Sequence, residues 1–322
     1  MKTHEKIFLT LLLLSCCSWG FFGHQKINRL AVFSLPVEMS GFYKKNIRYI
    51  EESAANPDRR RYIMPNEAPR HYIDLDDYGD SALQKIPRHW NKAVEKYGQD
   101  SLNAHGTLPW TIQSFYLQLK DAFLLKDSEK ILRLSSDLGH YVADAHVPLH
   151  TTKNYDGQLT GQIGIHSFWE SRLPELFSAD YDFYTGKAHY ISNVQLEAWK
   201  IIDHTHQAVD SVLNLEKKLS EKFSYQKFNF ETLGKKTVKV FSHDYSKAYH
   251  DLLSGMVERQ MRKSILMVGS LWYTAWIDAG QPDLKPLNNY KPSEEELKQR
   301  EEELKNWKKE RTKILRDTLH LH

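Results

Sequence analysis

The sequence predicts an all-α fold, organised as a single multi-helix domain with long loops. Three observations favour this class. Apolar residues recur at helical spacing along most of the chain, short polar residues precede several of these runs, and strand-like alternation is rare. The 322 residues are 41% hydrophobic and 12% aromatic, which is enough apolar material for one large core.

The expected helices follow the apolar periodicity in order along the chain. Asp127 with Ser128, and Ser192 with Asn193, are typical helix-start residues placed just before two of the runs. The runs cover residues 27–35, 42–50, 90–97, 112–125, 131–145, 165–177, 194–223 and 245–277.

Two long segments interrupt this pattern, at about residues 56–81 and 148–164. The second contains the glycines Gly157, Gly161 and Gly164. Long connections without a secondary structure of their own are uncommon inside a compact domain and are often functional. We therefore expect these two loops to contribute to a site.

The charge balance excludes some classes of protein. Lys plus Arg total 44 and Asp plus Glu total 41, so the formal net charge is +3. A chain this close to neutral is not expected to wrap a polyanion by bulk charge, although a small phosphate-bearing substrate stays possible. The 26% of charged residues occur together with many aromatic residues, which argues against disorder over most of the chain.

The N-terminal segment has the pattern of a secretory signal peptide. Lys2 and Lys6 precede the apolar run 7–14, and small residues follow up to Ser18. We expect cleavage after Ser18 and a secreted or periplasmic protein. Both cysteines of the chain lie within this segment, so the mature chain would have no disulfide and would depend on its core or on bound metal. No later segment reaches 18 consecutive apolar residues, so no transmembrane segment is expected.

We therefore expect the chain to divide into a signal peptide (1–18), one large domain (19–285) and a C-terminal extension (286–322). The extension is rich in Lys, Glu and Arg, with sparse Leu residues and Trp307. This composition predicts a solvated helix that packs by a narrow stripe, and a partner-binding helix is the alternative. No stable protein partner is predicted.

A candidate metal site lies in the segment 137–150. His140 and Asp144 are four residues apart, and four helical steps of about 100° bring both side chains to one face. Pro148 ends that helix, so His150 can turn back towards the same face.

A second pair with the same spacing follows, formed by His166 and Glu170. One such pair could simply stabilise a helix. Two pairs with a loop histidine between them favour a metal site with nitrogen and oxygen ligands.

Trp19 and His24 add a third element to this pattern. If Trp19 is the first mature residue, its free amine and its own carbonyl oxygen could chelate a metal with His24 nearby. With these residues, the spacing His-x3-Asp-x5-His followed by His-x3-Glu resembles the zinc-dependent phospholipase C and single-strand-specific nuclease superfamily. The resemblance covers residues 19–177 strongly and the remainder only as a helical pattern.

The resemblance implies three zinc ions per chain and a set of ligands for each. Asp144 would bridge two of the ions, and Asp58, Asp144 and Glu170 would be catalytic. The implied ligands are Asp58, His71, His140 and Asp144 for the first zinc, His150, His166 and Glu170 for the second, and Trp19, His24 and Asp144 for the third.

Two assignments leave alternatives. Asp58 is chosen because it lies thirteen residues before His71, near the spacing that the resemblance implies, and Asp74, Asp76 and Asp77 compete for its role. Among the other histidines, His146 lies about 240° around the helix from His140, so we expect it to be structural. No ligand context is seen for the histidines at positions 89, 105, 189, 204, 206, 320 and 322.

A cluster of zinc ions suits hydrolysis of a phosphate ester, because the metals lower the pKa of water and neutralise phosphoryl charge. The resemblance implies either a phospholipid head group or a single-stranded nucleic acid or nucleotide as the substrate. Glu170, the Asp-x-Asp run after Tyr72 and the lack of mature cysteines resemble the bacterial phospholipases C.

The alternative is a single-strand-specific nuclease or 3′-nucleotidase. Tyr72 could stack on a base and Asp74 could hydrogen-bond it, as the resemblance to the nucleases implies. A secreted zinc-binding protein without turnover is the alternative from another class. The phospholipase C-like reading is preferred.

Intact mass or N-terminal sequencing of the exported protein tests the cleavage point. We expect a mature chain that begins at Trp19, whose amine has an unperturbed pKa of about 7.7–8.0 and can bind zinc near neutral pH. The segment Leu13-Leu-Ser-Cys16 also resembles a lipoprotein signal. A mature chain that starts at lipidated Cys16 would contradict the prediction and remove the amine ligand.

Overall fold

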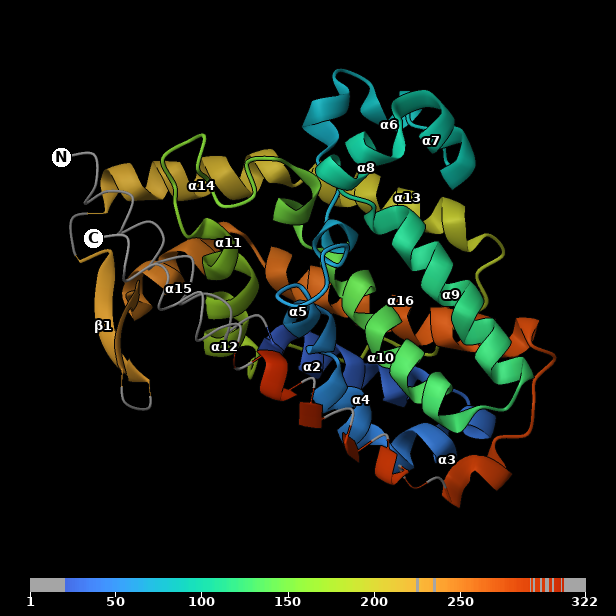
Figure 1. Ribbon diagram of the computed structural model, residues 1–322. Helices are drawn as coiled ribbons and strands as arrows, with labels where there is room; N and C mark the ends of the chain where they lie inside the picture. Colours follow the sequence, from blue (N-terminus) through green and yellow to red (C-terminus); the bar gives the residue numbers. More distant parts are fainter. Residues whose placement is uncertain are drawn as a thin grey trace.

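The computed structural model describes residues 21–223, 226–233 and 236–289, together with 291, 293–295, 297–298, 301–302, 304–307 and 309. The described chain is mostly helical, with one small antiparallel sheet, which confirms the predicted all-α class (Figure 1). The elements are α2 (Phe21–Ala31), η2 (Val32–Ser34), α3 (Val37–Lys45), α4 (Ile47–Ser53), α5 (Asn56–Arg60), η3 (Ala68–His71), η4 (Leu75–Tyr78), α6 (Ala82–Lys85), α7 (Trp90–Tyr97), α8 (Gln99–His105), α9 (Leu108–Leu124), α10 (Ser128–Asp144), η5 (Pro148–Thr151), α11 (Ile165–Ser167), η6 (Phe168–Arg172), α12 (Leu173–Phe177), α13 (Val194–His206), α14 (Val209–Lys222), β1 (Phe228–Leu233), β2 (Lys236–Phe241), α15 (His243–Leu252), α16 (Met256–Asp278) and η7 (Lys285–Asn289).

Helix α10 lies at the centre of the fold. It packs against α9, α16, α4 and α2, and its residues from Leu134 to Asp144 are all buried (Figure 1). Polar groups on this helix are paired within the core, since the indole of Trp272 donates to the Ser135 carbonyl and Tyr43 hydrogen-bonds the Ser135 hydroxyl. A helix buried on all sides provides a rigid base for side chains that must be held in one geometry.

The predicted helix starts agree with the structure at both positions. The Asp127 side chain accepts a hydrogen bond from the Lys130 amide at 3.1 Å, and the Asn193 side chain accepts one from the Leu196 amide at 2.9 Å. Each cap satisfies an amide that would otherwise lack a partner in the first helical turn.

Five of the expected helices are interrupted. The run 27–35 passes from α2 into the short turn η2, the run 42–50 divides between α3 and α4 at residue 46, and the run 165–177 divides into α11, η6 and α12. Two longer runs are divided as well. The run 194–223 divides into α13 and α14 at 207–208, and the run 245–277 divides into α15 and α16. At the second break Ser254 and Gly255 have positive φ angles of 49° and 74°, a backbone conformation that ends a right-handed helix. The apolar residues keep their helical spacing across both breaks, so the sequence pattern did not predict where these helices end.

The segment 56–81 was expected to be a loop but contains short helical turns, α5, η3 and η4. The hairpin of β1 and β2 was not expected at all. It pairs Phe228 with Phe241 and carries alternating side chains from Phe228 to Glu231, a signal that the helical reading overlooked. The hairpin lies at one edge of the molecule beside α15 (Figure 1).

The described part of the C-terminal extension includes helical segments within residues 294–309, and η7 packs against α3. Trp307 lies near Phe21 at the start of α2, with the ring centroids 6.5 Å apart. In the described part of the chain no helix is both long enough and apolar enough to span a bilayer. The expected signal peptide, Cys16 and Trp19 lie outside the described residues.

Gly139 allows α2 to approach α10 closely. A Cβ atom at this position would lie 2.0 Å from Asn28 Oδ1, and Asn28 is buried with its amide bound to the Ser136 carbonyl. We expect Gly139→Ala to lower the free energy of unfolding by about 1–3 kcal/mol, because the two helices must separate.

Urea unfolding measures this effect, with Gly41→Ala in α3 as the control. A Cβ at Gly41 meets only ordinary contacts, so this change should raise stability by about 0.5–1 kcal/mol. Equal stability of the two variants would contradict the predicted close approach.

Candidate metal centre

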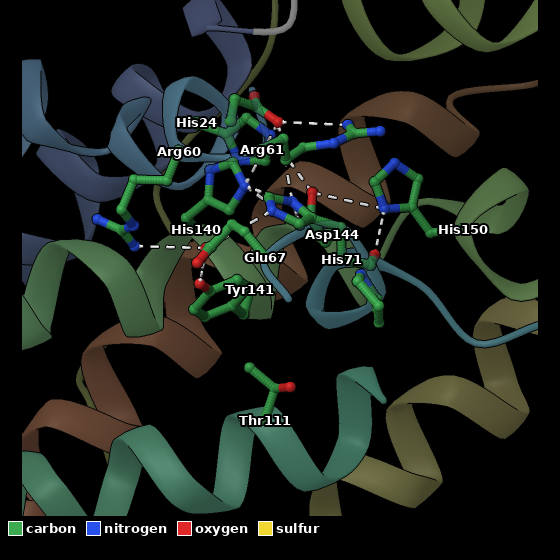
Figure 2. Close-up of polar contacts among 12 residues, drawn as sticks. His24, Arg60, Arg61, Glu67, His71, Thr111, His140, Tyr141, Asp144 and His150 are labelled. Carbon is green, nitrogen blue, oxygen red and sulfur yellow. Dashed lines mark hydrogen bonds and ion pairs between the residues drawn. The ribbon is translucent and has the colours of Figure 1, made fainter. Parts of the chain in front are cut away.

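The fold brings together acidic and histidine side chains from segments far apart in the sequence (Figure 2). Helix α10 supplies two of them near its C-terminal end, and six other elements supply one each. The residues are His24 on α2, Asp58 on α5, His71 at the end of η3, His140 and Asp144 on α10, His150 on η5, His166 on α11 and Glu170 on η6. These are all the predicted metal residues except Trp19.

The first group centres on one oxygen of Asp144. Asp144 Oδ2 lies 3.0 Å from His71 Nδ1 and 3.2 Å from His140 Nε2, and these two nitrogens are themselves 3.0 Å apart. Asp58 Oδ1 faces the same nitrogens at 3.8 and 3.9 Å. His71, His140 and Asp144 are almost completely buried.

The second group lies closer to solvent. His150 Nε2 is 2.9 Å from His166 Nε2, and Glu170 Oε2 lies 2.7 Å from His166 Nε2 and 3.4 Å from His150 Nε2. The side chains of His166 and Glu170 are 24% and 15% exposed. The second group is therefore more accessible to solvent than the first.

His24 connects the two groups. Its Nε2 atom lies 3.4 Å from Asp144 Oδ1 and 3.2 Å from Glu170 Oε1. Asp144 therefore contacts His24 through one oxygen and the histidines of the first group through the other. Glu170 likewise contacts His24 as well as the histidines of the second group.

The donor atoms are arranged as a metal ion requires. Ligands of a tetrahedral zinc at about 2.0–2.2 Å lie about 3.4 Å from one another, and the contacts in these groups bracket that value. Two pairs of imidazole nitrogens face each other at 3.0 and 2.9 Å, where their lone pairs would repel unless a proton or a metal lay between them. Several of these groups could therefore hold a metal ion.

Hydrogen bonds to the backbone orient two of the histidines. His140 donates from Nδ1 to the Ala54 carbonyl at 2.8 Å, and His150 donates from Nδ1 to the His71 carbonyl at 2.6 Å. Each bond places the proton on Nδ1 and leaves Nε2 free to bind a metal.

The site is strongly polarised. Burial opposes ionisation of Asp144, but the positive charge of His140 and His150 lowers the pKa of this carboxyl well below its usual range. Burial likewise disfavours the charged form of His140, yet Asp144 and Asp58 outweigh it and raise the pKa of His140 to about 9. Cations are thus favoured at the centre, either as protons on imidazole or as metal ions.

A single π-helical turn, η6, interrupts the regular helix expected over 165–177 between α11 and α12. It follows α11 directly and carries Glu170, whereas His166 lies on α11. Such wide turns occur often at functional sites. Here the side chains of His166 and Glu170 still meet across four residues.

The structure separates Asp58 from its competitors. Asp74 and Asp77 form a different group with His105, whose Nδ1 lies 3.0 Å from Asp77 Oδ2. Asp76 instead accepts hydrogen bonds from the Thr152 side chain and the Lys153 amide. Only Asp58, among these four carboxylates, faces the first group. The expectation that His105 has no ligand context was wrong, since the fold places it beside two carboxylates.

Arg61 was not singled out in the sequence. Its guanidinium lies 3.6 Å from Asp58 Oδ1, and its side chain is 44% exposed beside the cluster (Figure 2). The run of three arginines directly after Asp58 was the available signal. This position gives the site a solvent-accessible positive charge.

His146 is buried and lies outside every group of possible ligands in the described chain, as expected. Its Nδ1 donates to the Val142 carbonyl at 2.8 Å, and burial lowers the pKa of His146 to about 4. The residue is a neutral structural histidine.

The predicted substrate residues lie on a partly exposed rim. Tyr72 donates to the Ala104 carbonyl at 3.2 Å and is only partly buried. Tyr155, on the second long loop, is 45% exposed and its ring meets that of His166 edge-on at 6.0 Å. Burial, with the charge of Asp77, raises the pKa of Asp74 to about 6.

Comparison with models of known protein families and with curated protein sequences finds no match for this chain.

We expect Asp144→Asn to remove at least one metal ion per chain, because an amide has one acceptor and no charge where both carboxylate oxygens face histidines. Elemental analysis of protein purified without chelator measures this loss. His146→Ala is the control and should keep its metal. Metal loss from His146→Ala but not from Asp144→Asn would refute the ligand assignment.

The raised pKa of Asp74 predicts a pH dependence of stability. The folded protein holds this proton more tightly than the unfolded chain, so stability is present at about pH 4 and is lost as the pH rises through about 6. Asp74→Asn should therefore be more stable than the parent above pH 6, by about 1–2 kcal/mol, and show no gain near pH 4. Urea unfolding from pH 4 to 8 measures this difference, with exposed Asp80→Asn as the control for loss of one charge. A gain that does not depend on pH would disprove the assignment.

Proposed function

We propose that this protein is an exported zinc-dependent phosphodiester hydrolase of the phospholipase C and single-strand nuclease type. The observation that carries the proposal is the convergence of His24, His71, His140 and His150 on the two oxygens of Asp144. A carboxylate surrounded in this way suits a bridge between metal ions. His24 also contacts Glu170, which in turn contacts His166.

Three zinc ions fit the donor set as three ligand groups. Asp58, His71, His140 and Asp144 would hold the first ion, and His150, His166 and Glu170 the second. The third would be held by His24 and Asp144, with the amine and carbonyl of Trp19 at the mature N-terminus. Bound zinc supplies Lewis acidity, which lowers the pKa of water and neutralises charge on a phosphoryl group.

The chain's own residues bind and orient the reactants. Asp58, 21% exposed at the edge of the first group, accepts a hydrogen bond from the attacking water and orients it towards phosphorus. Arg61 donates to the non-bridging phosphoryl oxygens, where negative charge increases in the transition state. The reaction needs no nucleophilic serine or cysteine.

The preferred substrate is a phospholipid head group. Two exposed apolar side chains, Tyr155 and Leu159 at 45% and 64% exposure, belong to the loop that follows His150. Such side chains can contact an acyl chain or a lipid surface at the entrance to the site. The near-neutral charge of the whole chain also favours a substrate with a single phosphate over a long polyanion.

A nuclease or 3′-nucleotidase is the second candidate, because Tyr72 and Asp74 lie on the same rim. The partly buried ring of Tyr72 could stack on a base, and the carboxyl of Asp74 could pair with its edge. Tyr72→Phe keeps the ring and Tyr72→Ala removes it, so a comparison of the two variants separates the contribution of ring stacking from that of the hydroxyl.

A side-by-side assay of the mature, zinc-loaded protein on phosphatidylcholine vesicles, single-stranded DNA and RNA, and 3′-nucleotides tests the proposal. Hydrolysis of the lipid with loss of activity in Asp58→Asn and Arg61→Gln supports the preferred substrate. Hydrolysis of nucleic acid, with KM raised about 5- to 100-fold in Tyr72→Ala and little changed in Tyr72→Phe, supports the second.

Chelation should abolish activity and lower the melting temperature together, because the ions join segments distant in sequence. Tight zinc binding with no turnover of any phosphodiester would instead indicate a non-catalytic zinc-binding protein. A protein that binds no zinc would overturn both proposals.

A further inference from the structure

Glu67 is a fully buried carboxylate that no step of the proposed reaction uses. It precedes η3, four residues before His71, and has no exposed surface. Its Oε2 atom accepts a hydrogen bond from Arg70 at 2.9 Å. Its Oε1 atom accepts one from the Tyr141 hydroxyl and lies 3.5 Å from the guanidinium of Arg60 (Figure 2).

These contacts fix the position of the carboxylate. Arg60 is itself held by Asp137, with contacts of 3.2 and 3.0 Å, so both ends of its guanidinium are anchored. Two arginines and one hydroxyl thus surround Glu67 from three sides. The fourth side faces the ring of His71, where Glu67 Oε1 lies 3.8 Å from His71 Nε2.

The two nitrogens of His71 have different surroundings. Nδ1 faces Asp144 and His140 at 3.0 Å, within the first ligand group. Nε2 is buried and has no hydrogen-bond partner among the described residues. A neutral histidine that binds metal through Nδ1 carries its proton on Nε2, so this atom becomes a donor that needs an acceptor.

We propose that Glu67 is a positioning residue, which accepts the Nε2 proton of His71 and so holds Nδ1 towards the metal centre. A movement of about 1 Å would close the present separation to hydrogen-bond distance. The carboxylate keeps the ring in one tautomer and makes Nδ1 a stronger ligand. This inference rests on the proposed metal-binding function.

A purely structural role is the competing explanation, because Glu67 also balances the charges of Arg60 and Arg70. The two roles differ in their effect on the tautomer of His71. A structural residue affects the stability of the whole fold, whereas a positioning residue affects the tautomer of one imidazole and the affinity of one metal site. The tautomer and the metal affinity can both be measured without an assay of enzymatic activity.

The first experiment observes His71 directly in protein freed of metal by chelation. Long-range 1H–15N NMR distinguishes the two neutral tautomers of an imidazole. Without metal, Asp144 competes for the ring proton at Nδ1. We expect the parent protein to populate the tautomer protonated on Nε2, and Glu67→Gln to shift the population towards the tautomer protonated on Nδ1. Tyr141→Phe is the matched control, since it removes a hydrogen bond to the same carboxylate but leaves Glu67 opposite His71.

The second experiment measures zinc affinity by competition with a chelator. Glu67→Gln should weaken one zinc site by about 10- to 100-fold, and Tyr141→Phe should weaken it much less. In a His71→Ala background, Glu67→Gln should have no further effect on zinc affinity. Glu67→Asp keeps the charge beside Arg60 and Arg70 but withdraws it by one methylene, so it should weaken zinc binding even if Glu67→Gln does not fold.

The outcomes separate this inference from the proposed function. If Glu67→Gln lowers the free energy of unfolding but leaves the His71 tautomer and the zinc affinity unchanged, the residue is structural and the inference fails. Equal tautomer populations in the parent protein and in Glu67→Gln would overturn it even if the zinc affinity fell. If the parent protein binds no zinc, the proposed function fails, and the tautomer measurement still decides whether Glu67 controls His71.

Discussion

The burial of Asp144 among histidines is the constraint on which the rest of the structure depends. Both of its oxygens face imidazoles, and the residue is 1% exposed. A carboxylate taken out of water must be compensated by nearby positive charge and by hydrogen bonds. The chain therefore has to bring His24, His71, His140 and His150 to one point from four separate segments, and the positions of α2, η3 and η5 follow from that requirement.

Close packing around α10 makes this convergence possible. Gly139, directly before His140, lets Asn28 of α2 lie against the backbone of α10, and His24 is one turn earlier on the same helix α2. The rings of His24 and His140 consequently stack with centroids 3.9 Å apart. The stacking of these two candidate ligands thus depends on the contact between Asn28 and Gly139, neither of which is a candidate ligand.

The part of the site that sequence could predict is the part set by local periodicity. Helical spacing alone paired His140 with Asp144 and His166 with Glu170, and the structure places both pairs in contact. Arg61 and Glu67 were not predicted, because what makes them significant is a tertiary neighbour. His105 was misjudged for the same reason. The choice of Asp58 over Asp74, Asp76 and Asp77 rested on resemblance, since four carboxylates in one loop look equivalent until the fold separates them.

The two main ligand groups differ in access to solvent, and under the proposed function they would have different tasks. The side chains of His71, His140 and Asp144 are at most 2% exposed, whereas those of His166 and Glu170 are 24% and 15% exposed. An ion in the buried group would join α10 to η3 and α5, and would contribute most to folding in a mature chain expected to lack disulfides. An ion in the open group would be accessible to a phosphate. Asp58 and Arg61 lie at the exposed edge of the buried group, so a substrate that entered there would meet the guanidinium before it reached the metals. The proposed chemistry is therefore placed at the boundary between the two groups, where Asp144 contacts both.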